Sequence, residues 1–112
     1  MINITTHILN TSDGKPAAAV SVYLYFQNEE KWIEMSRGIT NKDGRITIFE
    51  LTGDELAPGI YKLRFETKAY FDNYSIASFY PCVEIIFNAP DSGHYHVPLL
   101  LNPFGYSTYR GS

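Results

Sequence analysis

Apolar residues recur at every second position along much of this chain, which is the period of a β-strand with one buried face. The clearest case is residues 59–66, where Tyr61, Leu63 and Phe65 alternate with polar or charged residues. Strands of this kind are predicted at residues 3–9, 20–26, 31–40, 45–51, 59–66, 80–89, 94–101 and 106–112. Turn signals such as Asp13-Gly14 and Asp43-Gly44 separate these segments.

One segment, residues 67–78, interrupts the alternation and lacks a β-branched run, so a short helix is expected there. Seven or eight short strands with turns between them, together with one helix, predict an all-β fold, an antiparallel β-sandwich. The length of 112 residues favours a single domain, residues 1–112.

The composition is that of a folded globular protein, with 45% hydrophobic and 19% charged residues. The single cysteine, Cys82, cannot form an intrachain disulfide and favours a reducing compartment, so we expect a cytoplasmic protein. The N-terminal residues do not resemble a signal peptide, and no stretch approaches the roughly 20 apolar residues of a membrane span. The net charge of −3, without a basic patch, argues against nucleic acid as a partner.

The nine tyrosines have two interpretations, because aromatic residues are enriched both in β-rich cores and in oligomer interfaces. The histidines raise a similar question. His7 and His96 each lie on the face opposite the apolar set of their strand. That second face also carries Leu9, Pro98 and Leu100, which would form an apolar patch if solvent covered it. The histidines are therefore either ordinary exposed residues or part of a cleft that another subunit covers.

Other readings of these residues are weaker. Pro98 cannot donate a backbone hydrogen bond, so an edge position or a bulge is expected there. His94 and His96 have the spacing of a strand chelate for zinc, but the only soft ligand is Cys82. A nucleophilic triad is also poorly supported, because the sequence has no Gly-x-Ser-x-Gly and Cys82 lies in an apolar strand.

Several blocks of the chain together resemble the 5-hydroxyisourate hydrolases, also called transthyretin-related proteins. The C-terminal block is "HYHVPLLLNPFGYSTYRGS", and the others are "THILNTSDGKPAAAV", "TNKDGR" and "GIYKLRFETKAYF". The resemblance covers essentially the whole chain, and the combination is highly specific. One departure is Asn102, where serine is usual before the proline.

The resemblance implies a transthyretin-like sandwich of two four-stranded sheets with one short helix, assembled as a homotetramer. Two subunits would pair edge to edge through their last strands, and two such dimers would stack and enclose a channel that holds the active sites. Transthyretin shares this fold but carries thyroid hormone and lacks the histidine, arginine, histidine set and the Tyr-Arg-Gly-Ser end. A non-catalytic ligand-binding tetramer is therefore the alternative to an enzyme.

The resemblance also implies an activity, the hydrolysis of a ring amide of 5-hydroxyisourate to 2-oxo-4-hydroxy-4-carboxy-5-ureidoimidazoline in urate degradation, with no metal or organic cofactor. Position by position, the catalytic residues are His7, Arg45 and His96. The substrate-binding residues are Tyr109 and Ser112, with Arg110 and Gly111 as supporting residues. His94 fits the same block but is not assigned a catalytic role.

These side chains suit the chemistry. A neutral histidine can activate water near pH 7, and a guanidinium can stabilise the charge that develops on a carbonyl oxygen. We expect His7 and His96 to form the acid/base pair, without an order between them, and Arg45 to act as the electrophilic clamp. Arg110 is expected to hold the C-terminal segment through an ion pair with a carboxylate.

Overall fold

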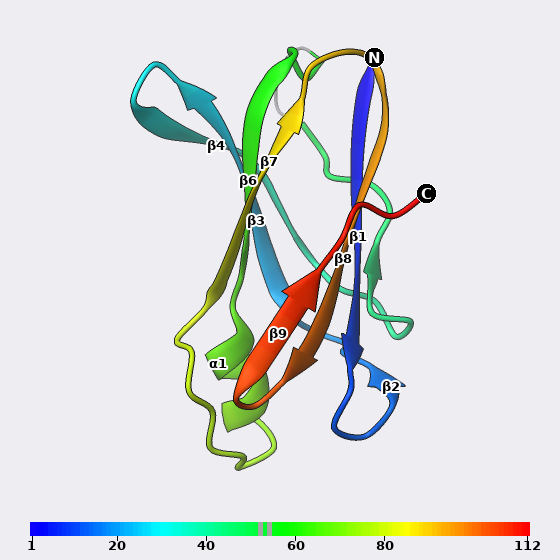
Figure 1. Ribbon diagram of the computed structural model, residues 1–112, viewed down its shortest axis with the longest axis vertical. Helices are drawn as coiled ribbons and strands as arrows, with labels where there is room; N and C mark the ends of the chain where they lie inside the picture. The colour runs from blue at the N-terminus through cyan, green and yellow to red at the C-terminus, as the bar shows by residue number, and fades with distance from the viewer. Residues whose placement is uncertain (52, 54) are drawn as a thin grey trace.

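The computed structural model describes residues 1–51, 53 and 55–112, which form two β-sheets packed face to face (Figure 1). The elements are β1 (Ile2–Asn10), β2 (Lys15–Pro16), β3 (Ser21–Asn28), β4 (Lys31–Ile39), β5 (Arg45–Ile46), β6 (Gly59–Phe65), α1 (Thr67–Asp72), β7 (Val83–Ala89), β8 (Gly93–Asn102) and β9 (Gly105–Thr108). One sheet has the order β2-β1-β8-β9, with β5 also paired to β1, and the other has the order β4-β3-β6-β7.

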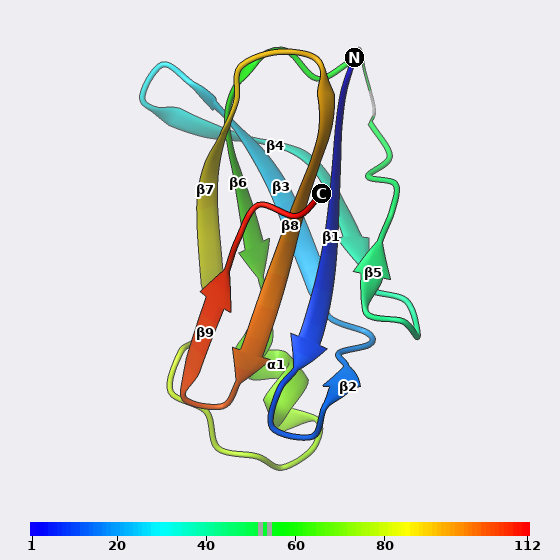
Figure 2. The same cartoon turned by 45° about the vertical axis from the view of Figure 1, so that its right-hand side comes forward.

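The β-sandwich with a short helix confirms the predicted fold class, with two corrections in detail. The first sheet has five strands instead of four, because the two-residue strands β2 and β5 both pair with β1. The sandwich is also not wholly antiparallel, since β1 and β8 run side by side in the same direction (Figure 2). These two strands lie near opposite ends of the sequence, and the whole second sheet is built from the residues between them.

The core forms where the inward faces of the sheets meet. Tyr61, Leu63 and Phe65 of β6 are 0% exposed, as their alternation predicted. Ile8 of β1 and Leu99 of β8 are equally buried and come from the other sheet. Burial of each such side chain contributes about 1.5–3 kcal/mol to the free energy of unfolding. The inward positions of β1 and β8 are thus fixed by packing, which also fixes the outward positions.

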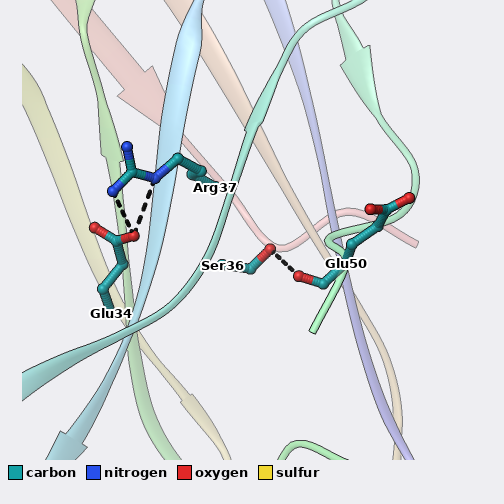
Figure 3. A network of polar contacts seen from close by, with 4 residues as sticks. All are labelled: Glu34, Ser36, Arg37 and Glu50. Carbon is teal, nitrogen blue, oxygen red and sulfur yellow. Dashed lines mark hydrogen bonds and ion pairs between the residues drawn. The ribbon is translucent and has the colours of Figure 1, made fainter. Parts of the chain in front are cut away.

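The strand predicted at residues 45–51 is wrong beyond its first two residues, since only Arg45 and Ile46 pair with β1. The following segment is held instead by Ser36 of β4, whose Oγ donates to the carbonyl oxygen of Glu50 at 2.6 Å (Figure 3). Phe49 inserts into the core and is 8% exposed. A side-chain contact and one buried ring replace the backbone ladder that alternation alone suggested.

The helix lies within the predicted segment 67–78, as α1 between β6 and β7, and it covers one end of the sandwich (Figure 1). Its residues Tyr70 and Phe71 are buried, and the side-chain amide of Asn10 donates to the Tyr70 hydroxyl at 3.2 Å. Within the part of the chain described here, no helix combines the length and apolar character needed to cross a membrane.

Pro98 lies in an inner strand, so the expectation of an edge position or a bulge was wrong. Its strand β8 pairs with β1 on one side, in a register that runs through Pro98 without a break, and with β9 on the other. The ladder with β9 ends at the pair Leu99 and Thr108. The missing N–H is tolerated because regular pairing with β9 stops just there, and the Thr108 hydroxyl donates to the Pro98 carbonyl at 2.7 Å.

Candidate active site

The outward face of the β5-β1-β8 region carries two adjacent rows of polar side chains. In the first row, Arg45 of β5 is the register partner of His7 of β1. In the second row, Thr5 of β1 is the register partner of His96 of β8. Direct partners across a ladder point to the same face of a sheet. Sheet register therefore brings together the three residues that were predicted to be catalytic.

The turn before β5 fixes the position of Arg45. Asn41 Oδ1 accepts hydrogen bonds from the backbone N–H groups of Asp43 at 2.9 Å and Arg45 at 3.0 Å. Gly44 has a φ of +73°, and a Cβ there would lie 2.5 Å from the carbonyl oxygen of Ile8, so the turn requires glycine. Ile8 in turn donates its N–H to the Gly44 carbonyl at 2.8 Å. The Asp-Gly-Arg sequence is thus locked against β1 with Arg45 opposite His7.

The electrostatics of the site keep both histidines neutral near pH 7. Burial lowers the pKa of His7 and the positive charge of Arg45 lowers it further, while a hydrogen bond to the Asp43 backbone and the Asp43 carboxylate act in the opposite direction. Burial also lowers the pKa of His96, followed by the charges of Arg45, His94 and His7. Each imidazole is therefore in the form that can accept a proton from water.

Thr5 is a site residue that the sequence reasoning missed. Its hydroxyl oxygen lies 2.7 Å from Nε2 of His94 and 2.7 Å from Nδ1 of His96, so it connects the two histidines. The only signal for it in the sequence is its position two residues before His7 on the same strand face. A threonine in a strand is an ordinary β-former, which is why this signal carries little weight by itself.

After β9 the chain turns across β8 and ends near β1 (Figure 2). Gly111 forms a bridge with His96, donating its N–H to the His96 carbonyl at 2.8 Å. A Cβ at Gly111 would lie 2.5 Å from Cδ2 of His96, so the backbone passes directly against the imidazole. Ser112 then borders a depression of about 330 Å³ together with Thr5, Arg45, His94 and His96.

Tyr109 and Arg110 do not reach this depression within their own chain. They border a separate depression of about 350 Å³ that also includes residues of β7 and β8. Tyr109 is 59% exposed. The Arg110 guanidinium lies over the ring of Tyr95, 5.0 Å from its centroid. Among the described residues this stacking takes the place of the ion pair that was expected for Arg110.

The depression offers little to a metal ion. His94 and His96 have ring centroids 6.1 Å apart and share the Thr5 hydroxyl. Over residues 1–51, 53 and 55–112, no group of three or more histidine, cysteine, aspartate or glutamate residues is arranged to hold a metal. The outward face of the sheet instead suits acid/base chemistry, with the neutral imidazoles of His7 and His96 and the guanidinium of Arg45. Arg45 and His96 line the depression itself, and His7 is not among its lining residues.

Comparison with known proteins identifies the family. The HIUase/Transthyretin family profile matches residues 4–111. This chain belongs to the HIUase/Transthyretin family. The 5-hydroxyisourate hydrolase of Halalkalibacterium halodurans is 46% identical, over 97% of this chain and 97% of its own length.

Solved structures of two kinds of protein in this family are similar to the chain. A structure of Klebsiella pneumoniae 5-hydroxyisourate hydrolase has a TM-score of 0.85 and 38% identity, and the match covers 98% of this chain and 99% of that chain. Sea bream transthyretin in complex with thyroxine has a TM-score of 0.90 and 30% identity, over 97% of this chain and 94% of that chain. The backbone alone therefore does not separate a hydrolase from a transthyretin that binds thyroxine, and the side chains of the site must do so.

Proposed function

We propose that this protein hydrolyses 5-hydroxyisourate by adding water to a ring amide, giving 2-oxo-4-hydroxy-4-carboxy-5-ureidoimidazoline. The observation that carries the proposal is the convergence of His7, Arg45 and His96 on one sheet face, in a chain that belongs to the HIUase/Transthyretin family. Relatives that are named 5-hydroxyisourate hydrolase and match nearly the whole chain support it.

The proposed mechanism uses only side chains of the chain. One neutral histidine removes a proton from water while the water oxygen attacks the ring carbonyl. Arg45 stabilises the negative charge on the carbonyl oxygen. The carbon–nitrogen bond then breaks, the imidazolium returns its proton to the leaving nitrogen, and the new carboxylic acid releases its proton to solvent and remains as a carboxylate. His7 and His96 are the proposed acid/base pair.

The test of this function is an absorbance assay on freshly oxidised urate. 5-Hydroxyisourate decays without a catalyst, so the protein must accelerate a decay that is already measurable. The decay is recorded with native protein, with heat-denatured protein and with none. Equal decay in all three, combined with saturable binding of a planar ligand, would replace the hydrolase by the non-catalytic binding tetramer.

The C-terminal residues have unequal parts in the proposal. Ser112 is proposed to contact substrate, because it borders the same depression as Arg45 and His96. Gly111 supports the site through its bridge to His96. Tyr109 borders the other depression, so we propose that it contacts substrate only if an assembly brings it to a neighbouring site. Arg110 then supports that segment by stacking on a buried ring.

The proposal includes a homotetramer, in which the face that carries the histidines is covered by another dimer. Leu9 and Leu100 are register partners on this face and are only partly buried. We expect Leu100→Glu to split the tetramer and to lower activity with it, because a carboxylate is costly to bury in an apolar contact.

Light scattering during size-exclusion chromatography measures the oligomeric state, and the absorbance assay measures the activity of the same sample. Ile33→Glu is the matched control, because Ile33 is 43% exposed on the other sheet. A Leu100→Glu dimer or monomer with full activity would show that the covered channel is not needed.

The lowered pKa values predict the acid limb of the pH–rate profile. The neutral imidazole is the working form, and both His7 and His96 have pKa values below the ordinary 6.5. We therefore expect the decline of kcat/KM toward acid pH to be centred below pH 6.5. In an NMR titration of Arg45→Gln, the pKa of His96 should rise, because a repelling charge has been removed. A decline of kcat/KM centred above pH 6.5 would contradict the assignment.

We also propose that the chain forms a single domain, residues 1–112, that acts in the cytoplasm and needs no cofactor. We expect prolonged treatment with EDTA to leave kcat unchanged, since acid/base groups and a guanidinium supply every step of the mechanism. Activity is compared before chelation, after it, and after zinc is added back. Loss on chelation with recovery on zinc addition would overturn the cofactor-free mechanism and point to the His94 and His96 pair.

A further inference from the structure

A threonine hydroxyl lies between two imidazoles at the centre of the site. Thr5 Oγ1 is 2.7 Å from His94 Nε2 and 2.7 Å from His96 Nδ1. All three residues stand on regular strands, with Thr5 and His96 as direct register partners and His94 two residues before His96. Thr5 is 7% exposed, so water has little access to compete for its hydrogen bonds. The arrangement is built into the sheet.

The hydroxyl restricts where the protons of both histidines can lie. A threonine has one O–H to donate and two lone pairs to accept with. It can therefore donate to His94 or to His96, but not to both. If it donates to His94 Nε2, it accepts from Nδ1–H of His96, and Nε2 of His96 is left with a free lone pair. If it donates to His96 Nδ1, then Nε2 of His96 carries the proton and cannot act as a base.

Of these two arrangements, only the first allows proton uptake by His96 without a rotation of the Thr5 hydroxyl. A protonated imidazole donates from both nitrogens, so Nδ1 of His96 must then face an acceptor. In the first arrangement Thr5 already accepts from Nδ1–H, and nothing has to rotate when Nε2 gains a proton. In the second arrangement the hydroxyl would have to turn around during the reaction. Preorganised hydrogen bonds to a developing charge are the ones that lower a barrier.

We propose that Thr5, oriented by His94, is a positioning residue that holds His96 in its Nδ1–H tautomer and so makes Nε2 of His96 the basic nitrogen. The proposal deepens the hydrolase function and rests on it. It gives His94 a definite part in the site: its Nε2 accepts the Thr5 proton, and it need not touch substrate. Thr5 and His94 then do for His96 what a buried carboxylate does for the histidine of a hydrolytic triad.

Nitrogen NMR of histidine-labelled protein tests the tautomer without any substrate. His96 is assigned by comparison with His96→Gln, and the spectra are recorded near neutral pH. We expect wild-type His96 to be protonated at Nδ1, Thr5→Val to lose this preference and Thr5→Ser to keep it. Thr6→Val is the control, because the neighbouring Thr6 hydroxyl donates to the Val97 carbonyl at 2.6 Å on the core side. It should lower stability but leave the His96 tautomer as it is.

Kinetics then test whether the tautomer matters. A hydrogen bond to a charged group contributes enough that Thr5→Val should lower kcat by about 10- to 100-fold, with little change in KM. Thr5→Ser should recover most of the loss. His94→Ala should cause a smaller loss, since Thr5 can still accept from His96. The double variant Thr5→Val/His94→Ala should be no slower than Thr5→Val, because both changes break one hydrogen-bonded chain.

The outcomes separate this inference from the proposed function. A wild-type His96 protonated at Nε2 would overturn the inference whether or not the protein hydrolyses 5-hydroxyisourate. The predicted tautomer combined with wild-type kcat in folded Thr5→Val would also overturn it, while leaving the hydrolase in place. If circular dichroism shows that Thr5→Val does not fold, His94→Ala is the test instead, because His94 is exposed and its removal leaves the core intact. Unchanged kcat and an unchanged His96 tautomer in His94→Ala would overturn the proposal that His94 orients Thr5.

Discussion

Replacing His96 by alanine is expected to lower kcat/KM for 5-hydroxyisourate by about 100- to 10,000-fold, which is the usual contribution of a general acid/base group. His7→Ala should have an effect of the same order, because His7 is the other member of the proposed acid/base pair. Arg45→Ala should also be severe, since the charge that develops on the carbonyl oxygen would lose its fixed cation. His96 and His7 are only partly buried, so neither change removes a large part of the core.

The measurement is the absorbance assay, with the uncatalysed decay subtracted, on variants whose circular dichroism and oligomeric state match those of the wild type. His94→Ala serves as the comparison within the same block and should be much less affected. Near-wild-type turnover in two of the three variants His7→Ala, Arg45→Ala and His96→Ala would show that the site lies elsewhere.

Gly111→Ala is expected to lower kcat by about 100-fold, although it adds a single methyl group and removes no polar atom from the site. The new Cβ would lie 2.5 Å from Cδ2 of His96 and 3.1 Å from its Cγ, so the imidazole must turn or the C-terminal segment must lift. Turning the imidazole takes His96 out of line with Thr5, and lifting the segment moves Ser112 away from the depression. A misplacement of about 1 Å in a catalytic group is enough for a loss of this size.

Gly105→Ala is the matched control in β9. Its Cβ would meet the side chain of Asn102 at 3.6 Å, an ordinary contact, and neither glycine has a positive φ. The difference between the two variants therefore isolates the contact with His96. Crystal structures of both variants would show the ring position directly. Wild-type kcat in Gly111→Ala, with the imidazole unmoved, would mean that the C-terminal segment does not constrain the base.

Local patterns in the sequence were sufficient to predict most of the strands and the short helix. The period of two placed Tyr61, Leu63 and Phe65 in the core, because alternation depends only on which face of a strand is buried. The segment after Ile46 was misjudged because its hydrogen bond goes to a side chain of β4, which no local pattern reveals. The parallel pairing of β1 with β8 was missed for the same reason, since alternation does not specify the partner of a strand.

The candidate site was predicted from blocks of sequence, not from periodicity. His7, Arg45 and His96 could be named because each lies in a block that resembles a known family, and sheet register then accounts for their proximity. Thr5 was missed because its importance depends on two residues near the other end of the chain. The stacking of Arg110 could not be predicted from the sequence either, because Tyr95 becomes its partner only when the C-terminal segment crosses the sheet edge.

The parallel pairing of β1 and β8 also bears on how the protein folds. Thr5 and His96 are separated by 91 residues, so closing this contact carries a large entropic cost and belongs to the class of pairings that slow folding. An intermediate that contains only the β4-β3-β6-β7 sheet would have a partial core but neither row of the site. During synthesis His7 leaves the ribosome early, but β1 can pair with β8 only after almost the whole chain has been made. Activity can therefore report the completion of folding, because the proposed catalytic groups meet only when the two ends of the sequence lie side by side.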